Sequence, residues 1–429
     1  MTYTDVNLVL EGDQPLRQRY ARLVETFELM RELALILNRK RVRRGSIDFD
    51  LPEPVIEFDQ EGMMRGVTRS ERNIAHRIIE EFMLSANECV ASYLEHKGVP
   101  SLYRIHEKPD PKKVFEFESI AASFGYSLGV GALPVRRMEM RSERRARHGT
   151  GRPAHMIELP EEVHITPRMY QKLTEKIAGK PEERILSYLM LRSLKQARYS
   201  EENVGHFALA APTYTHFTSP IRRYPDLIVH RILKEVLAAE AEEQGPARAG
   251  RGVPAHSETP SPWSKRVAGG HDFSRAVRHV KTKGASAPEV QAVLSEEALH
   301  AIAEESSQAE RRADDAEREL IEWKKIKFMR ERVGDEFDAL IVSATKFGFF
   351  VELMELFIEG LVPIATLTGD RYTYRENTKQ IIGERTKKKY SLGDRVKVVL
   401  DRIDRMQRKL QFAVLEEEPS RAERRHRHR

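Results

Sequence analysis

Apolar residues recur at helical spacing in four long stretches of the chain. They return every three or four positions from Leu16 to Leu37, from Ile74 to Leu94 and from Leu227 to Leu237. A fourth stretch, rich in charged residues, extends from about Ser295 to Arg332. This spacing places apolar side chains on one face of a helix, so it predicts long amphipathic helices. The first 332 residues are therefore expected to be largely helical.

From Val333 the pattern changes to short runs typical of strands. Glycine or charged turns separate five runs rich in β-branched and aromatic residues, EFDALIVSAT, KFGFFVEL, GLVPIATL, DRVKVVLDRID and RKLQFAVL. Five strands of this length suit a β-barrel of the OB-fold type. Phe349 and Phe337 are the expected core phenylalanines of that barrel. The predicted fold class is α+β, a largely helical part followed by a five-stranded OB-fold β-barrel.

Two segments interrupt the helical pattern. Residues 129–160 are basic and punctuated by glycine and proline, and residues 241–288 are polar and rich in proline and glycine. Such segments bury too little apolar surface to offset the entropy lost on ordering. We therefore expect two flexible insertions within a first domain at 1–332. The barrel is expected at 333–417, followed by a basic disordered tail at 418–429.

The overall composition is that of a cytoplasmic protein that contacts polyanions. The chain has 429 residues, 40% of them hydrophobic, with a net charge of +6 and a pI of 9.1. Arginines cluster at 135–148 and 421–429, which favours contact with nucleic acid. A signal peptide and a membrane-spanning run are both absent from the sequence pattern. The single cysteine, Cys89, follows an apolar pattern and is expected to be a buried core thiol.

The most informative segment extends from His206 to Leu233 and reads HFALAAPTYTHFTSPIRRYPDLIVHRIL. Arg222 and Arg223 precede a predicted helix, where backbone N–H groups favour anions, and Thr218 and Ser219 add short hydroxyl donors. Guanidinium groups bind phosphate oxygens through two parallel hydrogen bonds, so the segment predicts contact with a phosphodiester. The alternative is a structural ion pair between an arginine and Asp226 or another acid.

The same segment resembles the SPIRRYPDL signature of the RNase II/RNase R family of 3′-to-5′ exoribonucleases. Four further strings are similar to the catalytic RNB domain of that family: GDQPLR at 12–17, AHRIIEEFMLSANECVASYL from Ala75, SLYRIHEKPDPKK from Ser101 and LRSLKQARYSEENVGHFALA from Leu191. The resemblance implies hydrolysis of single-stranded and structured RNA to nucleoside 5′-monophosphates. It implies a catalytic Arg222, which stabilises charge on the phosphate, and RNA contacts by these other residues: Arg223, Tyr224, Thr218, Ser219, His216 and Glu81. Glu80 is the weaker alternative to Glu81.

Enzymes of this family use Mg²⁺ held by an Asp-rich cluster, and that cluster is not found in this sequence. Asp48 and Asp50 lie two apart in a predicted strand, but a solvated strand face explains them better, and no metal ligand is assigned. The histidines also lack the spacing of a zinc site. We therefore expect the C-terminal portion of such an enzyme, lacking the start of its RNB domain. The alternative is an inactive RNA-binding fragment. A monomer that binds RNA is expected, with a missing N-terminal half, the ribosome or other RNA-decay factors as further candidate partners.

The predicted barrel resembles the RNA-binding module named for ribosomal protein S-one. Such modules stack bases on aromatic rings and hold phosphates with basic side chains. The resemblance implies stacking on Phe347 and Phe350, with Lys346 and Arg371 beside the phosphates. The alternative is that one or more of these phenylalanines fills the barrel core.

Overall fold

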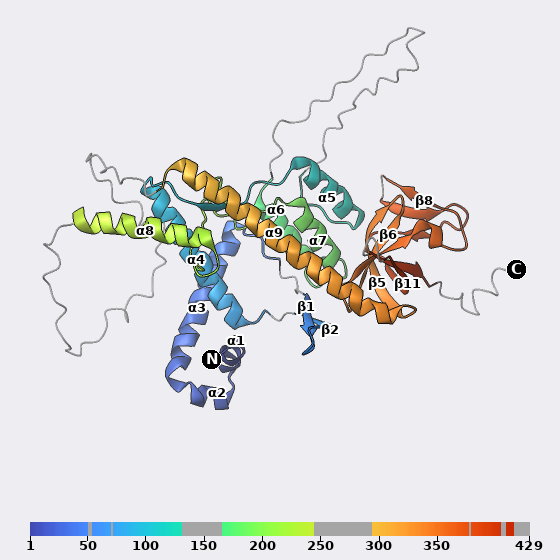
Figure 1. Cartoon of the computed structure of the whole chain (residues 1–429), viewed down its shortest axis with the longest axis horizontal. Coiled ribbons are helices and arrows are strands. Elements are labelled where there is room, and N and C mark those ends of the chain that lie inside the picture. Colours follow the sequence, from blue (N-terminus) through green and yellow to red (C-terminus); the bar gives the residue numbers. More distant parts are fainter. Residues whose placement is uncertain are drawn as a thin grey trace, which may run out of the picture.

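The structure, a computed structural model, describes residues 1–49, 54–69, 72–130, 165–243, 294–376, 379–404 and 409–415. Most of the two predicted insertions and the whole predicted tail lie outside these ranges. Helices occupy one end of the molecule and a barrel the other, and the long helix α9 (Glu296–Met329) extends from the helical end to the barrel (Figure 1).

The helical stretches predicted from periodicity are helices, with one break. The helices before α9 are α1 (Tyr3–Glu11), α2 (Gln14–Arg19), α3 (Ala21–Arg44), α4 (Ile74–His96), α5 (Pro111–Ser123), α6 (Pro167–Ile177), α7 (Glu183–Ser193) and α8 (Tyr224–Glu243). The stretch predicted as one helix from Leu16 is divided at Tyr20, whose backbone (φ −112°, ψ 28°) leaves the helical region. Helix α3 ends at Gly45, whose φ of 103° favours glycine.

The prediction that Cys89 is a buried core thiol is wrong, because its side chain is exposed. The buried face of α4 includes Asn87 and Ala91. Cys89 lies two residues from each of them, which is about 200° around a helix. It therefore points away from the neighbouring helices.

Two small antiparallel sheets support the helices. Strands β1 (Pro54–Phe58) and β2 (Met64–Arg69) form one hairpin, and β3 (Tyr103–Ile105) pairs with β4 (Arg198–Ser200). The predicted strand around Asp48 is therefore wrong at its start, because a strand begins only at Pro54. The β3–β4 pair brings the segment after α4 beside the segment that leads into the arginines. No helix in the described ranges is long and apolar enough to cross a membrane.

The second half of the predicted fold is a closed five-stranded barrel in the order β11-β12-β7-β6-β5. Its strands are β5 (Glu336–Thr345), β6 (Gly348–Leu353), β7 (Glu359–Pro363), β11 (Arg395–Asp404) and β12 (Lys409–Val414). Phe349 is completely buried in its core, and Phe337 packs against that core, as expected. Between β7 and β11 the chain adds a three-stranded sheet that the sequence pattern did not predict: β8 (Tyr372–Arg375), β9 (Gln380–Gly383) and β10 (Lys389–Tyr390).

Candidate functional site

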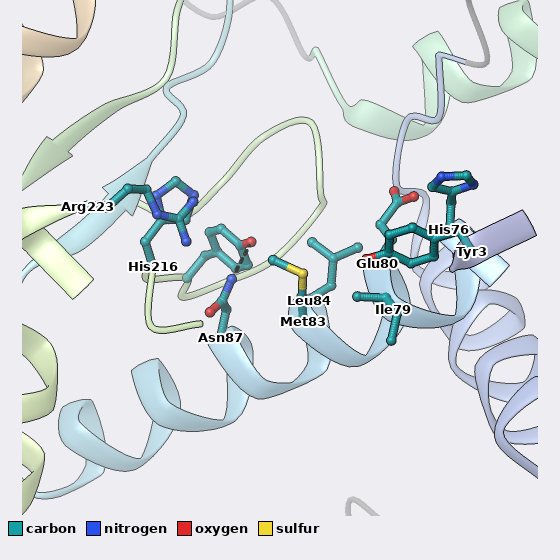
Figure 2. Close-up of a pocket in the computed structure, with 10 residues that line it drawn as sticks. Tyr3, His76, Ile79, Glu80, Met83, Leu84, Asn87, His216 and Arg223 are labelled. Carbon is teal, nitrogen blue, oxygen red and sulfur yellow. Dashed lines mark hydrogen bonds between the residues drawn. The ribbon is translucent and has the colours of Figure 1, made fainter. Parts of the chain in front are cut away.

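A cavity of about 260 Å³ follows one side of α4. Figure 2 shows Ile79, Met83, Leu84 and Asn87 of α4 along its floor, with an aromatic pair at one end and the arginine segment at the other. Ten residues line it: Tyr3, His76, Ile79, Glu80, Met83, Leu84, Asn87, Tyr214, His216 and Arg223. An apolar floor with polar groups at both ends is typical of a site that binds a small polar ligand or the end of a polymer.

The aromatic pair consists of Tyr3 and His76, whose rings are stacked with centroids 4.4 Å apart. Asn73 fixes the start of α4 by accepting hydrogen bonds from the backbone N–H groups of Ala75 and His76. Its side-chain oxygen also lies 2.7 Å from Nδ1 of His76, which orients the imidazole. Neither Tyr3 nor His76 was a candidate binding residue from the sequence. Stacking between residues 73 positions apart leaves no periodic signal.

Arg223 is held in place by the fully buried Asp226. One carboxylate oxygen of Asp226 accepts hydrogen bonds from Arg223 (2.7 Å) and from the backbone N–H of Ser219 (2.8 Å). The structural ion pair considered from the sequence is therefore present for Arg223, which also lines the cavity. The other Asp226 oxygen, Nε of Arg223 and Oγ1 of Thr218 are buried without a hydrogen-bond partner among the described residues. The loop beside the cavity therefore has three polar atoms that remain able to form hydrogen bonds.

Arg222 differs from its neighbour. Its side chain is exposed, and its guanidinium makes no ion pair or hydrogen bond within the part of the chain that the structure describes. Its backbone N–H donates to the carbonyl of Ser219, which closes a turn directly before α8. Tyr224, the first residue of α8, is 55% exposed. The turn therefore presents one unpaired arginine next to one anchored arginine, at the N-terminal end of a 20-residue helix.

His216 is a half-buried, neutral hydrogen-bonding group. Its Nδ1 lies 2.8 Å from the hydroxyl of Tyr199, and its ring contacts Tyr199 and Tyr214 edge to face. Burial, reinforced by the positive charges of Arg223 and Arg104, lowers the pKa of His216 to about 2. At physiological pH it can position other groups but does not supply a proton.

The sequence analysis missed Arg104, which connects this region to α9. Its guanidinium makes two hydrogen bonds to the carboxylate of Glu310 (2.5 and 2.9 Å) and lies 4.6 Å from the centre of the Tyr199 ring. Glu310 thus forms an ion pair with Arg104. The pair holds α9 against the β3–β4 sheet.

The structure places Glu80, and not Glu81, in the cavity, which corrects the choice made from the sequence. Glu81 is 5% exposed and accepts hydrogen bonds from Asn38 (2.8 Å) and from Arg41 (2.8 and 3.1 Å). It therefore faces α3. Glu80 lies on the cavity side of α4 with Met83, at a spacing of three residues, and binds Arg72 at 2.6 Å. The sequence alone could not decide which of the two adjacent glutamates lines the cavity.

A divalent-metal site is not formed by the described residues, since they include no group of three or more His, Cys, Asp or Glu side chains that could hold an ion. Asp48 instead faces two arginines, Arg72 at 3.2 Å and Arg41 at 3.5 Å. Asp50 lies outside the described residues. The donor groups of the described residues therefore do not fit the Mg²⁺ that the resemblance implied.

The two phenylalanines predicted to stack bases have different environments. Phe347 is 66% exposed at the β5–β6 turn, and Nζ of Lys346 lies 4.9 Å from the centre of its ring. Phe350 is half-buried and packs against the core cluster of the helical region, together with Leu340 and Val342 of β5. Phe350 thus joins the barrel to the helices, and the prediction that it is a free stacking ring is corrected. Only Phe347 retains an accessible ring.

Comparison with known proteins gives two domain matches. The RNB domain matches residues 1–239, and the S1 RNA binding domain matches residues 330–415. Ribonuclease R of Aquifex aeolicus is 37% identical over 416 residues, and Ribonuclease R of Escherichia coli is 36% identical over 418 residues. Each alignment covers 97% of this chain, but 48% and 43% of the respective relative. The chain therefore spans about half the length of the curated relatives it matches.

Solved structures show the same fold. Mycoplasma genitalium RNase R in complex with ribose methylated single-stranded RNA superimposes with a TM-score of 0.69 at 22% identity, covering 96% of this chain and 53% of the other. Yeast Ssd1, described as a pseudonuclease, has a TM-score of 0.52 at 17% identity and covers 89% and 37%. Because the RNB match begins at residue 1, the expectation that the start of that domain is missing is not supported. The RNB match extends over more than half of the residues, and the chain therefore belongs to the RNB domain family.

Proposed function

We propose that this chain acts as a 3′-to-5′ exoribonuclease of the RNase R type, which degrades single-stranded and structured RNA to nucleoside 5′-monophosphates. The observation that carries the proposal is the pair of arginines at the edge of the α4 cavity, Arg223 anchored by Asp226 and Arg222 unpaired among the described residues. A guanidinium already held by a buried carboxylate is positioned before the substrate arrives, whereas an exposed one can reach a phosphate.

The cavity suits the last nucleotide of an RNA strand. Its floor of Ile79, Met83 and Leu84 can contact a base or ribose, and the stacked rings of Tyr3 and His76 close one end. The phosphate would then lie toward Arg222 and the N-terminus of α8, where backbone N–H groups favour anions. Arg222 would stabilise negative charge that develops on the phosphate during hydrolysis. Thr218, Ser219 and Tyr224 flank it as further candidate donors.

RNB nucleases generally depend on divalent metal ions, and Mg²⁺ is the ion we propose for the intact enzyme. The described residues do not form its site, so the roles assigned here concern binding, orientation and charge stabilisation by this chain alone.

We also propose that residues 333–417 form an OB-fold module that holds single-stranded RNA through Phe347 and Lys346, and that 1–332 is the catalytic unit. The proposed partner is RNA. A cellular RNA substrate favours the cytoplasm as the location.

A second candidate function is RNA binding without hydrolysis. Two observations favour it: the described residues lack a metal-ligand cluster, and a protein described as a pseudonuclease shares the fold. Both candidates require RNA binding, and only the first requires release of mononucleotides.

Mononucleotide release separates the two candidates. The purified 429-residue chain is incubated with end-labelled RNA and Mg²⁺, beside the variants Arg222→Ala and Arg231→Ala. Arg231 is a matched control because it is also an exposed arginine, on α8. If the chain is catalytic, Arg222→Ala should lower the rate by about 10²–10³-fold, as removal of one fixed transition-state donor does, and Arg231→Ala should not. Binding of RNA by the unchanged chain without any mononucleotide release would favour the non-catalytic candidate.

A further inference from the structure

The three-stranded sheet β8–β10 is a rigid addition to the barrel. Its inner face supplies Ile381 and Tyr390 to the barrel core, where both are buried. The Tyr390 ring stacks on Phe349 with centroids 5.0 Å apart. In Figure 1 this sheet, labelled at β8, lies beside the barrel on the side away from α8 and α4. Because one face is fixed in the core, the opposite face has a defined orientation.

That opposite face is exposed and basic. Side chains alternate between the two faces of a strand, and Thr373 and Arg375 are the exposed members of β8, with the exposed Arg371 directly before it. Thr373 pairs across the sheet with Ile382, which in turn pairs with the exposed Lys389 of β10. Residues two apart on a strand are separated by about 7 Å, so the basic side chains form spaced rows rather than one point.

The β9–β10 turn extends this basic face, and Asp370 fixes its shape. The Asp370 carboxylate accepts hydrogen bonds from the backbone N–H groups of Arg371, Arg385 and Thr386 and from the Thr386 hydroxyl. All six residues from 384 to 389 are exposed. These hydrogen bonds hold the pKa of Asp370 well below its ordinary value, so the carboxylate stays ionised and keeps the turn closed. The lysines after Thr386 therefore project from a preformed turn.

Positive charge on this sheet is not neutralised locally. The segment from Gly369 to Tyr390 contains seven lysines and arginines against three acidic residues, a net charge of +4 in a chain whose total is +6. Asp370 is occupied by the turn, and Glu384 lies 3.9 Å from Arg371. Arg375, Lys387 and Lys389 make no ion pair with any residue that the structure describes. Like charges so close together destabilise the surface unless a polyanion binds there.

We propose that the outer face of β8–β10 and its turn form a second RNA-binding surface, which holds the phosphate backbone of RNA outside the strand that stacks on Phe347. The proposal rests on the proposed function only in naming RNA as the polyanion. The exposed face of the sheet offers the Thr373 hydroxyl beside the cations and, among the residues described there, no exposed large apolar side chain, which disfavours insertion into a lipid surface. Ile364, whose N–H donates to the Phe347 carbonyl, precedes Asp370 by six residues, so the Cα atoms of Ile364 and Asp370 are at most about 22 Å apart.

Salt dependence of RNA binding tests this surface, with no divalent metal ion present. The full chain is compared with a Lys387→Gln/Lys389→Gln variant and a Lys172→Gln/Lys176→Gln control, in which two exposed lysines of α6 lose the same charge. The probes are a fluorescent single-stranded RNA and a duplex of equal length. For the single strand, each lost phosphate contact should reduce the slope of log affinity against log salt by about 0.7, and the control should leave the slope unchanged. The probe that loses more affinity identifies the bound form of RNA.

Equal slopes for the variant, the control and the unchanged chain, with both probes, would overturn the proposal. An Asp370→Ala variant adds an independent test, because it raises the net charge by one yet releases the turn. We expect weaker RNA binding from it, whereas binding by charge alone would become tighter and contradict a built surface. Mononucleotide release is measured separately. If mononucleotides are released and the salt slopes of the variant and the unchanged chain are equal, only this surface is rejected. If no mononucleotides are released and the variant has a reduced salt slope, only the exonuclease function is rejected.

Discussion

The barrel and the helical region fill their interiors with different side chains. All the buried polar and charged residues of the described chain precede residue 330, among them Arg41, Glu81, His106 and Asp226. The barrel core is a single cluster of buried apolar residues centred on Phe349 and Phe412. The helical region is divided among three smaller apolar clusters.

This difference reflects what each region must position. A buried charge costs free energy unless partners satisfy it, but once satisfied it holds a neighbouring group in one geometry. The helical region uses Asp226 to fix Arg223 and Glu310 to fix Arg104 near the cavity. The barrel exposes its candidate RNA contacts on turns and strand faces, so its interior can remain apolar. Stability and site geometry are therefore coupled in the helical region and separate in the barrel.

The largest effect should come from breaking the buried Arg41–Glu81 pair. Replacing Glu81 by Ala leaves the Arg41 guanidinium, which is 6% exposed, without its main partner. We expect a loss of about 3–5 kcal/mol in the free energy of unfolding, measured by urea denaturation. Glu88→Ala, which breaks the more exposed Arg44 pair on the same helix, should cost less. Equal costs would show that the helical region does not depend on its buried charges.

Phe349→Ala should destabilise the barrel by a similar amount, about 3–5 kcal/mol, because it removes a fully buried ring from the core. The matched change is Phe347→Ala, two residues away, whose ring is 66% exposed. We expect that variant to unfold within about 0.5 kcal/mol of the unchanged chain. Urea denaturation followed by circular dichroism measures both. A large cost for Phe347→Ala would contradict the assignment of its ring to the surface.

RNA binding should depend on the ring of Phe347 and not on that of Phe350. Phe347→Ala should weaken binding of single-stranded RNA by about 1–3 kcal/mol, the contribution of one stacked base. Phe350→Ala, which removes a ring packed against the helices, should lower stability and leave binding by the folded protein largely unchanged. Fluorescence anisotropy under folding conditions measures both affinities. If Phe350→Ala weakened binding and Phe347→Ala did not, the stacking ring would be Phe350 and not Phe347.

Acid should weaken the helical region through two half-buried imidazoles, those of His206 and His216. Burial lowers the pKa of His206 to about 3 and that of His216 to about 2. In the unfolded chain each imidazole takes up a proton near pH 6.5, whereas in the folded chain it stays neutral. The contribution of each imidazole to the free energy of unfolding is therefore complete above pH 6.5 and is lost as the pH drops toward the folded pKa. Each imidazole can lower the free energy of unfolding by at most about 1.4 kcal/mol for each pH unit.

Unfolding free energies at pH 7, 6 and 5 test this effect, with His216→Gln as the comparison. The variant should show a shallower loss between pH 6.5 and 5 than the unchanged chain. The segment 330–415 contains no histidine, so probes of the barrel should report less of this change. Identical pH profiles for the two proteins would argue that His216 is not held neutral by the fold.

The amino-acid sequence predicted the long helices and the five strands of the barrel, because periodicity of apolar residues is a local property. It also located the arginine turn before α8, since Pro220, Pro225 and the apolar pattern after Leu227 act within a few residues. Its resemblance to a nuclease family was likewise readable from contiguous strings. The β8–β10 sheet escaped because its strands have two to four residues, too few for an alternating pattern to stand out.

Packing between segments distant in the sequence sets the role of each candidate side chain. The choice between Glu80 and Glu81 depended on the rotation of α4 relative to α3, which brings Arg41 and Asn38 to Glu81. The roles of Arg222 and Arg223 diverged because Asp226 can reach only one of them. Phe350 packs against a cluster formed by helices α5, α6 and α7, all of which end before residue 194. Contacts between residues so distant in sequence depend on packing geometry, and no local pattern encodes them.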